Sequence, residues 1–297
     1  MLQPQPRILM CRPDHFAVSY AINPWMDPAG WAAQDQRFAE AARRQWQALR
    51  RALSAEGVDI ELVPVVAGVP DLVFTANAAV VMDGKALLAR FRHPERQREE
   101  PHFARAFHAL VASGYIATVA YLPDGLVLEG AGDCVWDGTR GLFWMGYGPR
   151  SDRAAQSAVT DAFGLEVVAL ELADPRFYHM DTTLCPLTQG DVIYFPGAFT
   201  SDGLAAIRAR IAPDARIEID AADATTLAAN AVCLDDTIIL SRCSAGLRRN
   251  LETRGYRVVE TPLEAFLRSG GSAFCLTLRI DRRSSRTLRQ AWQRPAA

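Results

Sequence analysis

Four stretches of the chain repeat one arrangement of polar and apolar positions. In each, a polar residue precedes a short apolar run, a tight polar turn follows, and a second apolar run comes after the turn. The turns contain Asp-Gly, Gly-Asp or Asp-Asp between β-favouring residues, which is the sequence signature of a β-hairpin. The lead residues Asn77, Asp133, Asp181 and Asn230 lie 56, 48 and 49 residues apart. This spacing, about 50 residues, predicts a repeat architecture.

Helical patterns separate the hairpins, and a further short β-favouring run follows each one. Ser-Asp pairs at two of the expected helix starts are good N-caps, and glycines at positions 164 and 255 are typical of helix ends. The predicted helices cover residues 151–164, 201–211 and 244–255.

The N-terminal part of the chain fits as a fifth unit, with a strand at 7–13, an amphipathic helix at 34–55 and a returning strand at 59–65. The terminal apolar run, 275–280, is the expected partner of the first strand. Five ββαβ-like units would then close into a ring. We therefore predict a five-fold pseudosymmetric α/β-propeller, in which the lead residues converge on the axis.

Composition excludes several classes of function. The 32 Lys and Arg residues are balanced by 34 Asp and Glu residues, and no long basic run argues for a nucleic-acid surface. No apolar stretch approaches the length of about 18 residues that a membrane span needs, and the N-terminus lacks a secretory pattern. The six cysteines and five histidines show no metal-binding spacing. We expect a cytoplasmic protein with reduced thiols, no metal and no other cofactor.

Cys275 is the candidate nucleophile. In GGSAFCLTLRI it follows two glycines and two small residues, which allow close approach of another segment, and it opens the predicted last strand. A cysteine in an apolar strand is more often a small buried hydrophobic residue. The catalytic interpretation of Cys275 therefore depends on the other candidate residues.

The other candidates stand at or near the repeat leads. His179 and Asp181 are two residues apart, and on a strand they would both face the centre. Glu129 and Asp133 flank the glycines of EGAGD, and Asn77 lies in FTANA. Taken singly, each has a simpler interpretation. His179 and Asp181 could form a hydrogen-bonded surface pair, the EGAGD segment could be a turn with a capping acid, and Asn77 could form a turn.

Taken together, a thiol, an imidazole and several carboxylates suit a planar guanidinium group. Carboxylates accept its fork of N–H donors. A thiolate can attack the central carbon, and a histidine can protonate the departing amine and then activate water.

At this point the sequence resembles the guanidino-group-modifying enzymes, also called the amidinotransferase or pentein superfamily. The likeness covers roughly residues 7–280 and is strongest to arginine dihydrolases, with dimethylarginine dimethylaminohydrolases nearly as similar. The motifs that carry it are RPDHFAVSYAINPWM, PDLVFTANA, RFRHPERQREEP, EGAGD, GYGPRS, FYHMDTTLCPL, YFPGAF and GGSAFCLTLR. It implies a single pentein catalytic domain over 1–281, followed by a polar extension over 282–297 that we expect to be solvated or locally helical.

The resemblance also implies roles for individual residues. Cys275 would form the S-alkylthiouronium intermediate, and His179 would be the general acid and base. Glu129 and Asp181 would bind the guanidinium group, and Arg150 would clamp the substrate α-carboxylate.

Arg96 is a second candidate for that clamp, although either arginine could equally be a surface residue. Asn77 departs from the arginine deiminases, which carry an aspartate there. An asparagine both donates and accepts hydrogen bonds. Our hypothesis is that Asn77 and Asn23 retain a ureido intermediate for a second attack by Cys275.

The sequence therefore predicts a cysteine-dependent hydrolase that converts L-arginine to ornithine, carbon dioxide and two ammonia, with a small molecule as its partner. A dimethylargininase or deiminase that gives citrulline is the main alternative, and amidino transfer to an amine is another. A non-catalytic ribosome-binding factor also uses this fold, but it has no need of the thiol and histidine. Assembly into homo-oligomers stays open, and the loop at 23–31 is a candidate gate.

Overall fold

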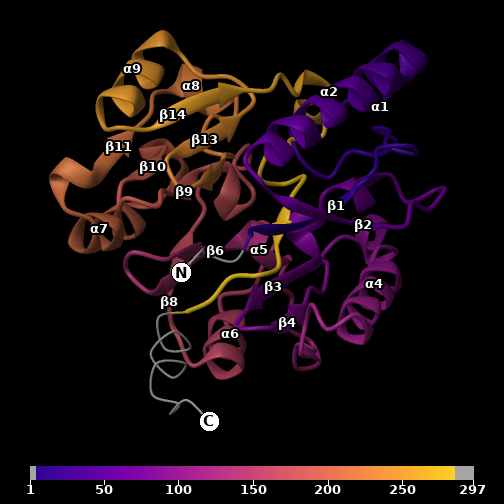
Figure 1. Cartoon of the computed structure of the whole chain (residues 1–297), viewed down its shortest axis with the longest axis horizontal. Coiled ribbons are helices and arrows are strands. Elements are labelled where there is room, and N and C mark those ends of the chain that lie inside the picture. The colour runs from indigo at the N-terminus through magenta and orange to yellow at the C-terminus, as the bar shows by residue number, and fades with distance from the viewer. Residues whose placement is uncertain (1–4, 285–297) are drawn as a thin grey trace.

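The computed structural model describes residues 5–284 and contains five three-stranded sheets arranged around a ring (Figure 1). Each sheet pairs its first strand antiparallel with a second, which pairs parallel with a third. In ring order the sheets are β15 (Leu278–Arg279), β1 (Arg7–Cys11), β2 (Asp59–Val63); β3 (Ala79–Met82), β4 (Lys85–Leu88), β5 (Thr118–Ala120); β6 (Cys134–Asp137), β7 (Leu142–Tyr147), β8 (Glu166–Glu171); β9 (Leu184–Pro186), β10 (Val192–Tyr194), β11 (Arg216–Glu218); and β12 (Val232–Leu234), β13 (Thr237–Leu240), β14 (Arg257–Glu260).

A longer helix connects the second and third strands of each sheet, and these helices lie around the outside of the ring (Figure 1). They are α2 (Asp35–Ala55), α4 (Glu100–Ala112), α6 (Ala155–Phe163), α7 (Ser201–Arg210) and α9 (Ala245–Thr253). Shorter helices lie in the connections: α1 (Pro28–Ala32), α3 (Pro94–Gln97), α5 (Gly130–Asp133), α8 (Ala221–Thr225) and α10 (Glu264–Leu267), with 3₁₀ turns η1 (Pro70–Val73), η2 (Thr75–Ala78), η3 (Met180–Thr182), η4 (Pro196–Ala198) and η5 (Pro213–Ala215).

Local chemistry explains why these elements form. In α2, the buried residues Phe38, Ala42, Trp46, Leu49 and Leu53 recur every three or four positions, so one apolar stripe faces inward. The hairpin of β3 and β4 turns at Asp-Gly, where both residues have positive φ, 54° and 78°. This is the backbone of a type I′ turn, which matches the twist of the flanking strands.

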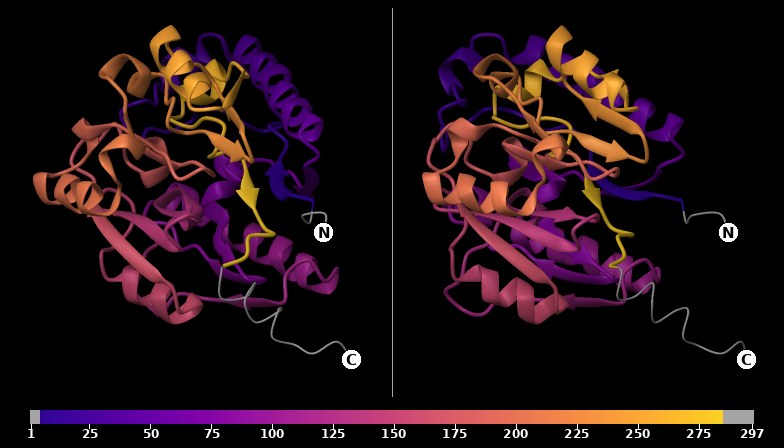
Figure 2. Two further views of the ribbon diagram at one scale, coloured as in Figure 1. Left: turned by 60° about the vertical axis from the view of Figure 1, so that its left-hand side comes forward. Right: turned by 90° about the vertical axis from the view of Figure 1, so that its left-hand side faces the viewer.

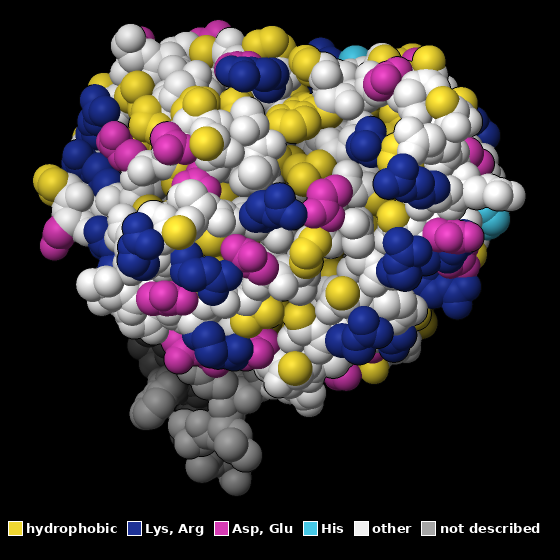
Figure 3. All heavy atoms as spheres, turned by 90° about the horizontal axis from the view of Figure 1, so that it is seen from above, with side chains coloured by type: hydrophobic (Ala, Val, Ile, Leu, Met, Phe, Trp, Pro, Cys, Tyr) yellow, Lys and Arg dark blue, Asp and Glu magenta, His cyan; other side chains and the backbone are white. Residues whose placement is uncertain are grey.

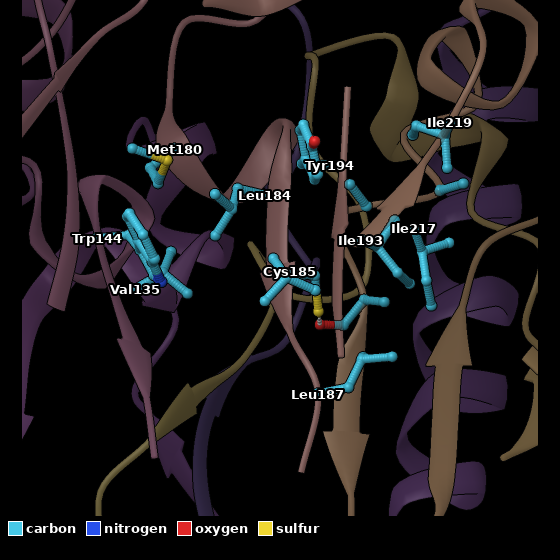
Figure 4. Close-up of a cluster of buried hydrophobic side chains, with 14 of the residues drawn as sticks. Val135, Trp144, Met180, Leu184, Cys185, Leu187, Ile193, Tyr194, Ile217 and Ile219 are labelled. Carbon is cyan, nitrogen blue, oxygen red and sulfur yellow. Dashed lines mark hydrogen bonds between the residues drawn. The ribbon is translucent and has the colours of Figure 1, made fainter. Parts of the chain in front are cut away.

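The core consists of clusters of buried side chains that each extend from one repeat to another. One cluster of buried side chains joins the third, fourth and fifth repeats, and it includes Trp144 of β7, Leu184 of β9 and Ile238 of β13. Figure 4 shows part of this cluster, with Cys185 next to Ile193 on the paired strands β9 and β10. Because each repeat buries its apolar face against the next one, the repeats form a single body.

The terminal strand closes the ring, as the sequence predicted. Leu278 and Arg279 of β15 pair antiparallel with Leu9 and Ile8 of β1, and Figure 2 shows the two strands side by side. The fold class is confirmed, and so are helices close to 34–55, 201–211 and 244–255. The helix α4 of the second repeat was not predicted.

Three details differ from the sequence prediction. The last strand begins at Leu278, and Cys275 lies in a helical turn before it, in which Leu276 donates to the Ser272 carbonyl. The helix α6 begins at Ala155 because the side chain of Ser151 is bound elsewhere. The expected extension begins with residues 282–284, which are hydrogen-bonded to the β3–β4 turn, and the rest of it lies outside the described residues.

The surface charge and the length of the helices complete the description of the fold. On the face seen in Figure 3, acidic and basic side chains alternate. Within residues 5–284, no helix has both the length and the apolar character that crossing a bilayer requires.

Candidate active site

The repeat leads do converge, but none lies on a strand: three lie on one-turn helical segments and Asn230 lies on a bend. Asn77 lies in η2, Asp133 ends α5, Asp181 lies in η3, and Asn230 is the second residue before β12. Each segment directly precedes the first strand of its repeat. The prediction that His179 and Asp181 share a strand face was therefore wrong, although both side chains do reach the site.

Cys275 is buried and is held by two residues from other repeats. Its Sγ lies 3.2 Å from Asp181 Oδ2 and 3.1 Å from Asn230 Nδ2, and its backbone N–H donates to Asn230 Oδ1 over 3.1 Å. Burial and the neighbouring Asp181 carboxylate raise the pKa of Cys275 well above its ordinary value. The resting residue is therefore a neutral thiol that donates to Asp181.

His179 is bound to Glu129. Its Nε2 lies 2.8 Å from Glu129 Oε2, and the same oxygen accepts a hydrogen bond of 3.0 Å from Arg150 Nη1. Burial favours the neutral carboxyl, but the Arg150 charge and the His179 hydrogen bond outweigh it and hold the pKa of Glu129 well below its usual range. Burial lowers the pKa of His179 to about 4. Since ionised Glu129 can only accept, Nε2 of the neutral imidazole carries the proton.

Asn77 is held in one orientation by its neighbours. Arg96 forms a two-pronged pair with Glu99, with both contacts at 2.8 Å, and its Nη1 donates to Asn77 Oδ1 over 3.0 Å. Asn77 Nδ2 donates to the Glu129 carbonyl over 3.1 Å. Because an arginine can only donate, the amide oxygen of Asn77 must face Arg96.

Arg150 and Asn23 connect the ring to the loop at 20–26. Arg150 Nη2 donates to the Ile22 carbonyl over 3.3 Å, and its guanidinium carbon lies 4.5 Å from the centre of the Tyr178 ring. Asn23 Nδ2 donates to the Ser269 carbonyl over 3.1 Å. This loop thereby covers the site.

Glycines allow the segments to approach this closely, as the sequence indicated. A Cβ on Gly132 would lie 2.2 Å from Asn77 Nδ2, and one on Gly271 would lie 2.3 Å from Phe74. Gly130 also has φ of +64°, a conformation that other residues rarely adopt.

The space enclosed by these side chains is small, about 10 Å³, roughly what a single water needs. A molecule the size of an amino acid could therefore enter only if the covering loop moved. Six of the eight predicted site residues line the chamber, namely Asn23, Asn77, Arg96, Arg150, His179 and Cys275. The other two lie directly behind the lining residues: Glu129 is hydrogen-bonded to His179, and Asp181 to Cys275.

Comparison with known proteins agrees with this ring and this cluster. A sequence model of the family described as N,N dimethylarginine dimethylhydrolase, eukaryotic, matches residues 12–282. The chain belongs to this family of guanidino-modifying enzymes. Its five-sheet ring is the pentein fold.

Several relatives carry names from this chemistry. The bifunctional arginine dihydrolase/ornithine cyclodeaminase AgrE of Nostoc sp. is 43% identical over 274 residues, which is 92% of this chain and 38% of AgrE. The N(G),N(G)-dimethylarginine dimethylaminohydrolase of Mycobacterium tuberculosis is 37% identical over 276 residues, covering 92% of this chain and 85% of the relative. This chain therefore spans well under half the length of the bifunctional relative.

A crystal structure of the N-terminal domain of ArgZ, an arginine dihydrolase from cyanobacteria, bound to substrate, matches this fold with a TM-score of 0.87. The two sequences are 41% identical, and the match covers 94% of this chain and 99% of that domain.

Sequence reasoning missed several residues of this pentein site. Asn230 was recognised as a repeat lead but received no role. Ser151 was interpreted as a helix cap, yet its Oγ donates to Asp133 Oδ2 over 2.5 Å and accepts from the Glu129 N–H over 3.0 Å. Asp71 was also missed, although it lies in the PDLVFTANA motif and lines the chamber.

Proposed function

We propose that this chain is an arginine dihydrolase, which converts L-arginine and two waters to ornithine, carbon dioxide and two ammonia. One observation carries the proposal. Asp181 accepts a hydrogen bond from Cys275 through Oδ2, while its buried Oδ1 accepts none within the described part of the chain. A buried carboxylate oxygen without a donor is costly. A guanidinium N–H would satisfy this oxygen and bring the guanidinium carbon next to the sulfur of Cys275.

The substrate cation would itself activate the nucleophile. Burial also raises the pKa of Asp181, to about 7, so the resting Cys275–Asp181 pair is poor in negative charge. A positive guanidinium group beside the pair favours the thiolate and the carboxylate. The proton that Cys275 loses is the one that His179 needs as an acid, and Glu129 stabilises the imidazolium that forms.

The first half-reaction follows from these positions. The thiolate attacks the guanidinium carbon and a C–S bond forms. His179 protonates the departing nitrogen, the C–N bond breaks, and ammonia leaves an S-alkylthiouronium adduct. Neutral His179 then takes a proton from water, which attacks the same carbon, and cleavage of the C–S bond gives a ureido product and the free thiol.

The second half-reaction repeats this chemistry on the ureido carbon. Attack by Cys275 expels the second ammonia and leaves a thiocarbamate. Water releases this adduct as a carbamate, which breaks down to ornithine and carbon dioxide. Asn77 lines the chamber and, once released from the Glu129 carbonyl, offers its N–H to a neutral ureido oxygen, which an aspartate could not do.

The substrate α-carboxylate is assigned to Arg150, with Arg96 as the second cation of the chamber. Both guanidinium groups already contact acids, and Arg96 has donated three N–H groups to Glu99 and Asn77. Arg150 is better placed, because its Nη2 contact to the Ile22 carbonyl is long, 3.3 Å, and belongs to the loop that must move. Similarity supports arginine as the substrate, since AgrE is 43% identical and the dimethylarginine enzyme 37%.

The test is product stoichiometry from the purified chain given L-arginine, citrulline or N,N-dimethylarginine. Two ammonia per ornithine from arginine are expected. One ammonia per citrulline would instead show a deiminase, and dimethylamine with citrulline would show a dimethylargininase. The Cys275→Ala variant is the matched control, because it should fold but release no product.

A further inference from the structure

A second and much larger cavity lies on the other side of the segment that carries the nucleophile. It has a volume of about 330 Å³, within the range of small-molecule sites. Its walls come from the first strands β6, β9, β12 and β15, which surround the ring axis beyond the repeat leads. Phe274, directly before Cys275, is part of the wall, but no residue lines both this cavity and the Cys275 chamber.

Two arginines reach this cavity, and their surroundings differ. Arg279 is neutralised by Asp281, which accepts hydrogen bonds from its Nε and Nη2. Arg282 is half-buried, and its side chain forms no hydrogen bond or ion pair with any described residue. Burial and the charge of Arg279 lower the pKa of Arg282 to about 10, so it stays charged at neutral pH.

A partly desolvated cation without an acid partner is costly, and an anion relieves that cost. The guanidinium fork fits the two oxygens of a carboxylate or a phosphate. The rest of the lining combines apolar side chains, such as those of Trp136 and Phe274, with polar ones, such as that of Thr188. Apolar walls with a few polar groups and a charged contact are the usual composition of a site for a small organic molecule.

We propose that this cavity binds a small organic anion, whose carboxylate or phosphate pairs with Arg282 and whose apolar body packs against Trp136 and Phe274. Because the cavity and the Cys275 chamber share no lining residue, the anion does not compete with arginine. The proposal is therefore independent of the reaction at Cys275.

The test measures binding of benzoate and of phenyl phosphate to the full chain by isothermal titration calorimetry, with neutral benzamide as the control ligand. We expect the anions to bind and benzamide to bind at least about tenfold more weakly. The preferred anion identifies the headgroup. The measurement is repeated with Cys275→Ser protein, which should bind the anions equally well whatever the reaction at Cys275.

Two neighbouring arginines provide matched variants. Arg282→Met removes the cation and keeps the chain length, and it should raise the dissociation constant at least about tenfold. Arg283→Met changes an exposed residue that does not line the cavity, and it should leave the constant unchanged. Absence of anion binding, equal binding of benzamide, or equal affinity in Arg282→Met protein would overturn the proposal. Circular dichroism of both variants verifies that they are folded.

Discussion

The side-chain amide of Asn230 contacts Cys275 at two points. Its Oδ1 accepts the backbone N–H of Cys275 and its Nδ2 donates to the sulfur, and both distances are 3.1 Å. The same Nδ2 also lies 3.1 Å from the Asp181 carbonyl oxygen. A donor aimed at sulfur stabilises the thiolate relative to the thiol. Asn230 therefore both fixes the proposed nucleophile and favours its thiolate form.

Replacing Asn230 by Asp should lower kcat for arginine by at least about 100-fold. The new carboxylate would remove the donor and place a second negative charge beside the sulfur, which disfavours the thiolate. Asn250→Asp is the matched control, because Asn250 lies exposed on α9. Steady-state kinetics of both variants measure the effect, and a kcat within about threefold of the parent in Asn230→Asp would contradict it.

The titration of Cys275 provides a second prediction. Burial and the charge of Asp181 raise the pKa of the thiol, so the substrate-free protein should hold no thiolate at Cys275 near neutral pH. Asp181→Asn removes that charge and should shift thiolate formation to lower pH. The measurement is ultraviolet thiolate absorbance against pH, with Cys275→Ser subtracted to remove the other five cysteines. A Cys275 thiolate signal at pH 7 without substrate would contradict this account.

Product partition tests Asn77. Asn77→Asp keeps an acceptor for Arg96 but places an oxygen against the Glu129 carbonyl, where Nδ2 now donates. It also loses the ability to donate to a ureido oxygen. The expected result is a shift from ornithine to citrulline, measured by amino-acid analysis after complete conversion of arginine. Unchanged ornithine output would rule out the role of Asn77.

The covering loop gives a prediction about access. Trp25 Nε1 donates to the Arg176 carbonyl over 2.7 Å and so fastens the loop to the fourth repeat. Trp25→Phe keeps an aromatic side chain but removes this hydrogen bond, which should make opening of the covering loop easier. Cys275 should then react faster with a bulky alkylating reagent at a fixed alkaline pH. Trp136→Phe, far from the loop, should not change that rate, and equal rates in parent and Trp25→Phe protein would show that this bond does not limit access.

The free energy of unfolding tests the role of Glu129, whose Oε2 contacts both His179 and Arg150. Glu129→Gln would leave the buried Arg150 without its counter-charge, so unfolding by urea should show a loss of about 3–5 kcal/mol. The folded pKa of Glu129 lies below its ordinary 4.5, so its contribution is complete above that pH and is lost as the pH falls. The difference between parent and variant should therefore shrink in acid. Glu95→Gln, at an exposed position, should be neutral.

Sequence periodicity was enough to predict the ring, because four of the five repeats carry a hairpin turn and the terminal apolar run was left as the partner of the first strand. The spacing of the repeat leads also placed Asn77, Asp181 and Asn230 together at the axis. Periodicity could not predict the local backbone conformation at the site. The run from Ser272 to Thr277 is apolar enough for a strand, but it forms a turn in which Thr277 donates to the Phe274 carbonyl.

The roles of Ser151 and Asn230 depend on partners that are distant in the sequence. Ser151 stands before a helix, where a serine commonly caps, yet its hydroxyl donates to Asp133 and accepts from the Glu129 N–H. Asn230 binds Cys275 across 45 positions of the chain. Only the folded ring brings such partners into contact, and tertiary contacts override local preference in both cases.

The pairing of β15 with β1 has a consequence for biosynthesis. Synthesis proceeds from the N-terminus, so Glu129, His179, Asp181 and Asn230 are all made before Cys275. The strand that follows Cys275 is also the one that completes the ring. A nascent chain that stops short of this point has the acids and the imidazole but lacks Cys275. The reaction proposed for the centre can thus begin only when the fold is complete.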